Sequence, residues 1–280
     1  MNKNVFKTYV LLAALGGALV LVGRQFLGPN GPLIGLGLGL LLVGGSYWFS
    51  DKMAIRASRA QPVTEDQAPQ LYAMVRELTT RANLPMPRLY VIPSEQPNAF
   101  ATGRNPKHAA VAVTEGIMKM MSRDELRGVI AHELAHVRNR DILIGSVAAA
   151  VATGITYVAY LSFFLGGSSD DDDGGGGGFL MFFLAPMAAG LLQMALSRSR
   201  EFEADRTAAT MIGTGEPLAR ALETMEVATK KIPMNVNPAQ ASAYIVNPLG
   251  GRRVNMASLF STHPPTEARI ERLRGWRPGF

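Results

Sequence analysis

The sequence predicts a mainly α-helical integral membrane protein, with four transmembrane helices and a cytosolic α+β part that carries a small sheet. Three observations predict this class. Hydrophobic residues make up 48% of the 280 residues and charged residues only 18%, whereas globular domains average roughly 25% charged residues. The apolar residues are concentrated in charge-free windows, and a helix needs about 20 mostly apolar residues to cross a bilayer. The polar residues between these windows show the periodicities of short helices and strands.

The N-terminal part, residues 1–50, contains two charge-free windows and is predicted to form a transmembrane hairpin. The first window covers residues 8–23, between Lys7 and Arg24, and the second covers residues 25–50. A cleaved signal peptide is disfavoured, because no small-x-small cleavage site followed by a polar start lies near Arg24. Buried core helices are the remaining alternative, and the length of the windows argues against them.

A second transmembrane hairpin is predicted over residues 142–197. Its windows, residues 142–169 and 174–197, are separated by an acidic run over residues 170–173. The connecting segment over residues 168–178 holds four Asp and five Gly, so we expect a flexible, exposed loop. Four adjacent Asp residues lack the alternating spacing of a calcium-binding loop, which argues against a metal site there.

Basic residues predict how the hairpins are oriented. The loop between the first two windows offers only Arg24, and the Asp/Gly loop has neither Lys nor Arg. We therefore expect a multi-pass protein of the cell (inner) membrane. By the positive-inside rule, both termini lie in the cytoplasm and the Asp/Gly loop lies on the outer side of that membrane. The residues that support this orientation are Lys3, Lys7, Lys52, Arg56, Arg59, Arg138, Arg140, Arg198, Arg200 and Arg206.

The first cytosolic part, residues 51–141, is predicted to combine helices with strands. Apolar residues at helical spacing predict a helix over residues 64–83. Ser122 followed by Glu125 is a capping box, which opens a helix that runs to about Asn139. Strands are expected by composition over residues 88–92 and 109–114.

The second cytosolic part, residues 198–280, is predicted to be helical around a loop-rich segment. Helices are expected over residues 201–212, 217–230 and 266–274. Residues 233–251 are rich in Pro, Gly and Asn, which is typical of loops.

The predicted helix that opens at Ser122 carries a His-Glu-x-x-His motif. His132 and His136 are four residues apart, so both rings lie on one face of the helix, about 6 Å apart along its axis, and can reach one metal. Glu133 lies near enough to a metal-activated water to act as a general base without ligating the metal. The alternatives are a solvated helix face and a structural zinc site, but structural sites use four protein ligands, usually Cys, and the chain has no Cys.

A third ligand is required, and Glu201 is the strongest candidate. The helix of His132 leads into the second hairpin and Glu201 follows it, so an antiparallel hairpin returns the chain to the same membrane surface. Asp205 lies one turn beyond Glu201 and is placed to accept the second ring N–H of a ligand histidine. The other histidines, His108 and His263, remain as alternatives. Metzincins are excluded, because their further motif positions hold other residues here.

The combination of motifs resembles the HtpX family of membrane-bound zinc metalloproteases, relatives of the eukaryotic CAAX-prenyl endopeptidases. The matching parts are two N-terminal spans, the His-Glu-x-x-His helix, two further spans, a Ser-Arg-x-x-Glu-Phe-x-Ala-Asp stretch from Ser197 to Asp205, and His263-Pro264-Pro265. The resemblance implies a zincin-like protease domain. It also implies one Zn²⁺ per subunit, held by His132, His136 and Glu201, with Glu133 as the catalytic acid and base.

Two further site assignments follow from resemblance. It places His263 near the active site, where we expect its ring N–H to stabilise the oxyanion; a surface histidine that caps the last helix is the alternative. Asn98, Ala99 and Phe100 resemble the edge strand by which thermolysin-like proteases hold an extended peptide, and an ordinary edge strand is the alternative.

The family also implies substrates and a setting. It predicts an endopeptidase in the quality control of membrane proteins, with misfolded or damaged membrane proteins as substrates and the lipid bilayer as a partner. A catalytically inactive scaffold that keeps a zinc site is the main alternative. A prenyl-peptide protease is disfavoured, because the eukaryotic relatives have more spans. The net charge of +6 suggests a nucleic-acid binder, but topology explains the basic residues and no binding motif is present, so we expect no nucleic-acid partner.

Overall fold

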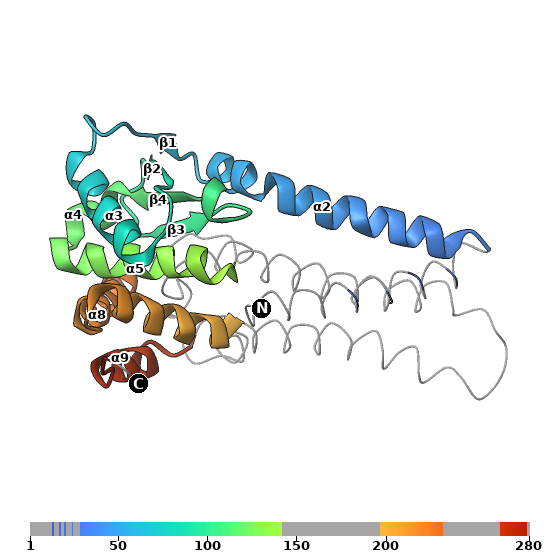
Figure 1. The fold of residues 1–280 in the computed structure, drawn as a ribbon. Coiled ribbons are helices and arrows are strands. Elements are labelled where there is room, and N and C mark those ends of the chain that lie inside the picture. Colours follow the sequence, from blue (N-terminus) through green and yellow to red (C-terminus); the bar gives the residue numbers. More distant parts are fainter. Residues whose placement is uncertain are drawn as a thin grey trace. The chain divides into compact units, whose positions relative to one another are not determined.

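The computed structural model describes residues 29–141, 197–231 and 264–278, together with Ala13, Gly17, Val20 and Arg24 (Figure 1). The chain divides into two compact units: Met1–Trp48 with Leu143–Leu196, and Phe49–Ile142 with Ser197–Phe280. The spans predicted over residues 8–23, 142–169 and 174–197 lie almost wholly outside the described residues. The second unit holds the sheet and the predicted site.

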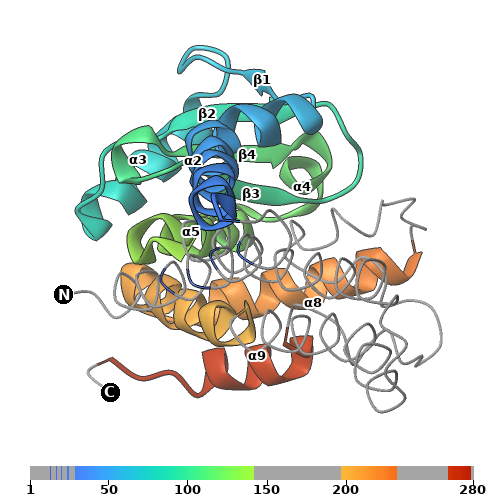
Figure 2. The ribbon, with the colours of Figure 1, turned by 90° about the vertical axis from the view of Figure 1, so that its right-hand side faces the viewer.

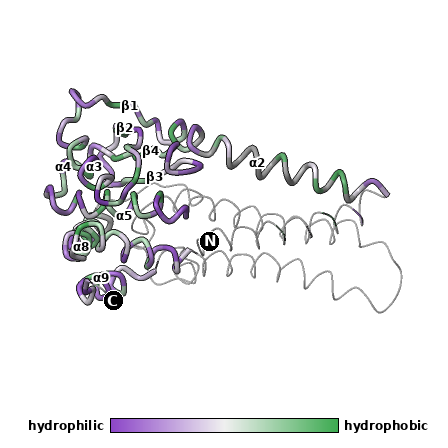
Figure 3. The backbone as a smooth tube through the Cα atoms, viewed as in Figure 1, coloured by the Kyte–Doolittle hydropathy of each residue, from purple (hydrophilic) through white to green (hydrophobic). Residues whose placement is uncertain are grey.

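Helix α2 (Gly31–Ala57) covers most of the second predicted span. It begins in the first unit and ends in the second. Figure 3 colours much of this helix white to green, and several of its large apolar side chains are exposed, namely Leu33, Ile34, Leu41, Trp48 and Phe49. Among the residues described, no helix combines the length and the apolarity needed to cross a membrane.

A mixed four-stranded sheet forms one layer of the second unit, in the order β1-β2-β4-β3. The parallel pair β2 (Arg88–Ile92) and β4 (Ala110–Thr114) confirms the two strands predicted from composition. Every residue of β4 is buried, as expected for a central strand. β3 (Ala99–Thr102) pairs antiparallel with β4 and forms an edge. The other edge, β1 (Gln61–Pro62), is too short to show a periodicity and was not predicted.

Helix α3 (Pro69–Ala82) begins five residues later than the predicted start at Thr64. The backbone N–H of Thr64 donates to Oε1 of Gln67 at 2.9 Å, which stabilises a turn in place of a first helical turn. Pro69 then occupies the first turn, where its missing N–H costs nothing. At the other end Asn83 adopts the left-handed conformation, with φ of 53°, and closes the helix.

Helix α5 (Arg123–Asn139) carries the motif and is confirmed at both ends. The hydroxyl of Ser122 accepts from Glu125 N at 3.3 Å, and Ser122 N donates to Glu125 Oε2 at 2.8 Å. The capping box therefore forms as the sequence predicts. Short helix α4 (Glu115–Met120) precedes it and was not predicted.

The remaining helices pack on the far side of α5 from the sheet. Figures 1 and 2 show α5 between the sheet and α8 (Glu216–Lys231), with α9 (Thr266–Arg274) outermost. Gly128 allows α5 and α8 to approach closely, because a Cβ there would lie 2.6 Å from Leu218 N. Residues 197–212 form one further helix, called here the 197–212 helix. Core residues shared by these layers include Leu78, Val113, Ile130, Ala208 and Leu222.

Candidate active site

Helix α5 presents two histidine rings to one point in space. Nε2 of His132 and Nε2 of His136 lie 3.2 Å apart, as the spacing of one helical turn allows. His132 is buried and His136 is half-buried. Both rings therefore direct the same nitrogen toward a common centre.

Glu201 of the 197–212 helix completes this group. Its Oε2 lies 3.5 Å from Nε2 of His132, and its Oε1 lies 3.6 Å from Nε2 of His136. One ligand atom from each of the three residues falls within 4.8 Å of the others, so the group can hold a metal ion. The structure thus brings together three residues that the sequence placed in one site, although 65 positions separate Glu201 from His136.

The spacing of these atoms fits zinc. A tetrahedral zinc ion with ligands at about 2.0–2.1 Å places neighbouring ligand atoms roughly 3.3 Å apart. The two Nε2 atoms lie 3.2 Å apart, and the nearest Glu201 oxygens lie 3.5 Å from His132 (Oε2) and 3.6 Å from His136 (Oε1). A set of two histidines and one glutamate leaves a fourth position open, as in catalytic zinc sites.

Two carboxylates orient the rings through Nδ1, the ring nitrogen that does not face the metal group. Nδ1 of His132 lies 2.9 Å from Oδ1 of Asp205, as expected from the sequence, and Nδ1 of His136 lies 2.9 Å from Oδ2 of Asp141. Each carboxylate favours the tautomer that leaves Nε2 available to a metal. Asp141 was missed, because it lies beyond the end of α5. Its position depends on Arg140, whose φ of 60° ends the helix.

The carboxylates also favour positive charge between the rings. Burial disfavours the charged form of His132, but Asp205 and Glu201 outweigh it and raise the pKa of His132 to about 10. A position that attracts a proton so strongly also attracts a metal cation, which must displace that proton to bind.

Glu133 lies next to the metal group without joining it. Its side chain is buried, and burial raises the pKa of its carboxyl group above the usual range, despite the nearby histidines. The backbone N–H of Ala101, in edge strand β3, donates to Glu133 Oε2 at 2.8 Å. A carboxylate held in this way, with a raised pKa, suits a general base.

Arg269 is a residue of this site that sequence reasoning missed. It comes from α9, is 1% exposed, and binds Asp205 through two contacts, Nη2 to Oδ1 at 2.7 Å and Nε to Oδ2 at 2.9 Å. Its Nη1 also lies 3.5 Å from Oε2 of Glu201. Such a two-point pair stabilises buried carboxylates. Figure 3 shows why it was missed: α9 is mostly hydrophilic, a pattern typical of an exposed helix.

The remaining predicted residues have different outcomes. His108 is exposed in the short 3₁₀ helix η1 (Pro106–His108), with Nδ1 at 2.9 Å from Oδ1 of Asn105, and is not in the metal group. His263 lies outside the described residues. Asn98 directly precedes edge strand β3, which begins with Ala99 and Phe100. The contact of these three residues with substrate stays a prediction.

Replacing Arg269 by Leu is expected to destabilise the second unit. Removing one partner of a buried pair leaves charge uncompensated and typically costs about 3–5 kcal/mol. The measurement is thermal unfolding of the detergent-purified protein in chelator, so that no cation replaces the guanidinium. Arg274→Leu is the matched control. Its partners Glu216 and Glu223 are half exposed, so we expect a cost of about 0–1 kcal/mol. Equal stability of the two variants would contradict a structural role for Arg269.

Comparison with known proteins agrees with this geometry. The family model described as Peptidase family M48 matches residues 65–277. A Protease HtpX homolog of Pelotomaculum thermopropionicum is 51% identical over 281 residues, covering 96% of this chain and 98% of the relative. A Protease HtpX homolog of Syntrophobacter fumaroxidans is 51% identical over 278 residues, with the same coverage of 96% and 98%.

A solved structure shows a similar fold. The crystal structure of S. mikatae Ste24p matches with a TM-score of 0.58 and 21% identity, covering 96% of this chain. The match covers 64% of the Ste24p chain, so this chain spans slightly less than two thirds of that protein. At this identity the likeness concerns the fold alone.

Proposed function

This chain belongs to peptidase family M48, and from that premise we propose that it is a zinc-dependent endopeptidase acting at the cytosolic surface of a membrane. The resemblance to the HtpX family is confirmed, and with it the assignment as a metallopeptidase and hydrolase. One observation carries the finer proposal. His132, His136 and Glu201 converge with one ligand atom each within 4.8 Å of the others, beside the buried carboxyl of Glu133.

Glu133 has the central role in the proposed reaction. A bound zinc ion supplies Lewis acidity, which activates water and polarises the scissile carbonyl. Glu133 accepts the proton of the attacking water and returns it to the leaving amine. The contact from Ala101 N–H keeps the carboxylate in place between these two transfers.

Edge strand β3 is the proposed platform for the substrate. Thr114 N donates to Asn98 O at 2.9 Å, so the backbone groups of Asn98 and Phe100 face β4. Because hydrogen-bonding direction alternates along an antiparallel strand, the backbone groups of Ala99 and Ala101 face away from β4. Ala101 binds Glu133 there, and Ala99 has its backbone groups directed toward an added peptide strand. One strand thus positions both the substrate and the base. His263 is proposed to donate to the oxyanion.

The proposed setting is a cell membrane with the active site in the cytoplasm. Residues 1–50 and 142–197 form the two transmembrane hairpins in this proposal, and residues 51–141 and 198–280 form the catalytic parts. The exposed apolar side chains of α2 and the bias of Lys and Arg toward one side support it. Polypeptides are the substrates of a protease, and we propose misfolded or damaged membrane proteins in particular.

Casein cleavage by the detergent-purified full chain tests the proposed activity. We expect cleavage to stop when a chelator removes the metal and to return with about one equivalent of zinc per chain. The buried Glu133 and its contact with β3 favour an active enzyme over a scaffold that merely retains a zinc site. Bound zinc without any cleavage would favour the scaffold, and cleavage that resists the chelator would exclude the metal mechanism.

A further inference from the structure

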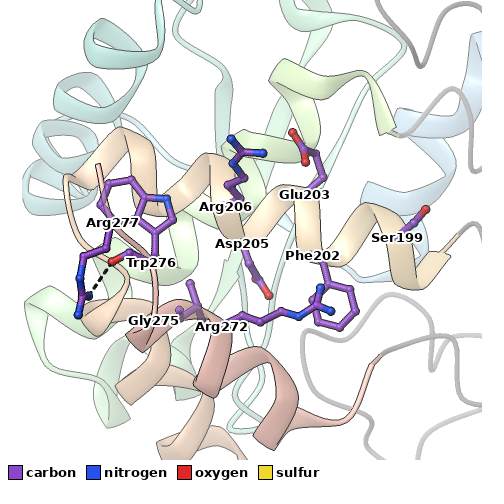
Figure 4. Close-up of a pocket in the computed structure, with 10 residues that line it drawn as sticks. Ser199, Phe202, Glu203, Asp205, Arg206, Arg272, Gly275, Trp276 and Arg277 are labelled. Atoms are coloured by element: carbon purple, nitrogen blue, oxygen red, sulfur yellow. Dashed lines mark hydrogen bonds between the residues drawn. The ribbon is translucent and has the colours of Figure 1, made fainter. Parts of the chain in front are cut away.

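A pocket of about 600 Å³ lies between the 197–212 helix and the C-terminal segment. The side chains that matter for its chemistry are Phe202, Arg272, Trp276 and Arg277. Figure 4 shows Phe202 and Arg272 together at one end and Trp276 and Arg277 at the other. Neither the metal group nor the proposed substrate strand β3 lines this pocket.

Arg272 is held in place by an aromatic ring. Its guanidinium carbon lies 3.8 Å from the centre of the Phe202 ring. Stacking fixes the plane of a guanidinium and leaves its N–H groups, which point outward in that plane, available to an anion. Arg274, on the same helix, is different because Glu216 and Glu223 neutralise it. In the described part of the chain, no carboxylate forms an ion pair with Arg272.

Arg277 is fixed by the backbone at the opposite end. Its Nη1 donates to Trp276 O at 3.0 Å and to Arg274 O at 3.3 Å. Within the described residues, Arg277 also has no ion-pair partner. The pocket therefore has one oriented guanidinium at each end, and that of Arg272 stacks on the Phe202 ring.

The carboxylates that line the pocket do not cancel this charge. Asp205 is paired with Arg269 at 2.7 Å. Glu203 is exposed, and Figure 4 shows it above the 197–212 helix while Arg272 lies below. Figure 4 shows Arg206 on the same side of that helix as Glu203, so Arg272 and Arg277 carry the positive charge of the pocket.

We propose that this pocket binds the phosphate of an anionic phospholipid headgroup. Planar guanidinium groups match phosphate oxygens with two parallel hydrogen bonds. Aromatic rings beside them suit the polar boundary of a bilayer. The lipid source rests on the proposed membrane location, because the 197–212 helix begins where the fourth predicted span ends. Recognition of phosphate itself rests only on the pocket.

Trp276 reports binding directly. The chain has two tryptophans, so Trp48→Phe leaves Trp276 as the only indole. We would titrate this full-length, zinc-loaded protein in a neutral maltoside detergent with dihexanoyl phosphatidylglycerol and follow its emission. A saturable change is expected, with an affinity at least about tenfold above that for dihexanoyl phosphatidylcholine.

Matched variants and competitors make the result decisive. Arg272→Gln should weaken phosphatidylglycerol binding by about tenfold or more, and Arg274→Gln, outside the pocket, should leave it within about twofold. Equal effects of the two variants, or equal binding of both lipids, would overturn the proposal. Tighter binding of inorganic phosphate or glycerol phosphate would overturn the lipid source. Displacement of the lipid by a hexaglutamate peptide would assign the pocket to an acidic polypeptide.

This titration is independent of catalysis. It measures the emission of Trp276 as lipid is added, so its result can be interpreted even if the chain cleaves no casein. The casein assay in turn still tests the proposed protease activity if the pocket binds no lipid. Thermal midpoint and zinc content, measured for each variant, show that a loss of binding does not reflect unfolding.

Discussion

In the Glu133→Gln variant, we expect casein cleavage to fall about 10²–10⁴-fold, the usual contribution of a positioned general base. Glutamine has the same shape as glutamate and can still accept the hydrogen bond from Ala101 N–H, so the fold of the site should persist. It cannot take a proton from water. The measurement is initial cleavage rate at saturating casein, together with zinc content by mass spectrometry.

Zinc content separates the role of Glu133 from that of a ligand. Glu133 is not in the group that can hold the metal, so its replacement should leave zinc at the wild-type level. Glu203→Gln is the control, because Glu203 is exposed on a different helix and should leave both readings unchanged. Cleavage above about a tenth of the wild-type rate in Glu133→Gln would contradict the assigned role.

The Glu201→Ala variant is expected to lose both zinc and activity. It removes one of three protein ligands, and even residues that only orient a ligand typically change metal affinity by about 10–100-fold. We therefore expect a loss greater than about 100-fold for Glu201→Ala and about 10–100-fold for Asp205→Ala. The measurement is zinc occupancy in buffers that fix free zinc in the nanomolar range.

Two sets of variants serve as controls for this prediction. His132→Ala and His136→Ala should behave like Glu201→Ala, because all three contribute one ligand atom each. Glu203→Ala, two positions away on the same helix and exposed, should keep full occupancy. Full occupancy of Glu201→Ala at nanomolar free zinc would mean that the third ligand lies elsewhere.

The sequence by itself determined the local elements of the catalytic part. The capping box of Ser122 and Glu125 specifies where α5 begins, because both of its hydrogen bonds form within one turn. The spacing of His132 and His136 specifies one shared face, because helical geometry is regular. Glu201 could be predicted as well, since the order of elements along the chain implies an antiparallel return.

Only the tertiary structure decided which distant side chains support this site. Asp141 reaches His136 because Arg140 adopts the left-handed conformation that ends α5. Arg269 reaches Asp205 because α9 packs outside α8 and turns one arginine inward while Arg272 and Arg274 remain exposed. No periodicity distinguishes these three arginines, because burial depends on neighbours more than 40 residues away in sequence. Desolvation and pairing of charge are properties of the packed state, and they appear only when the layers have assembled.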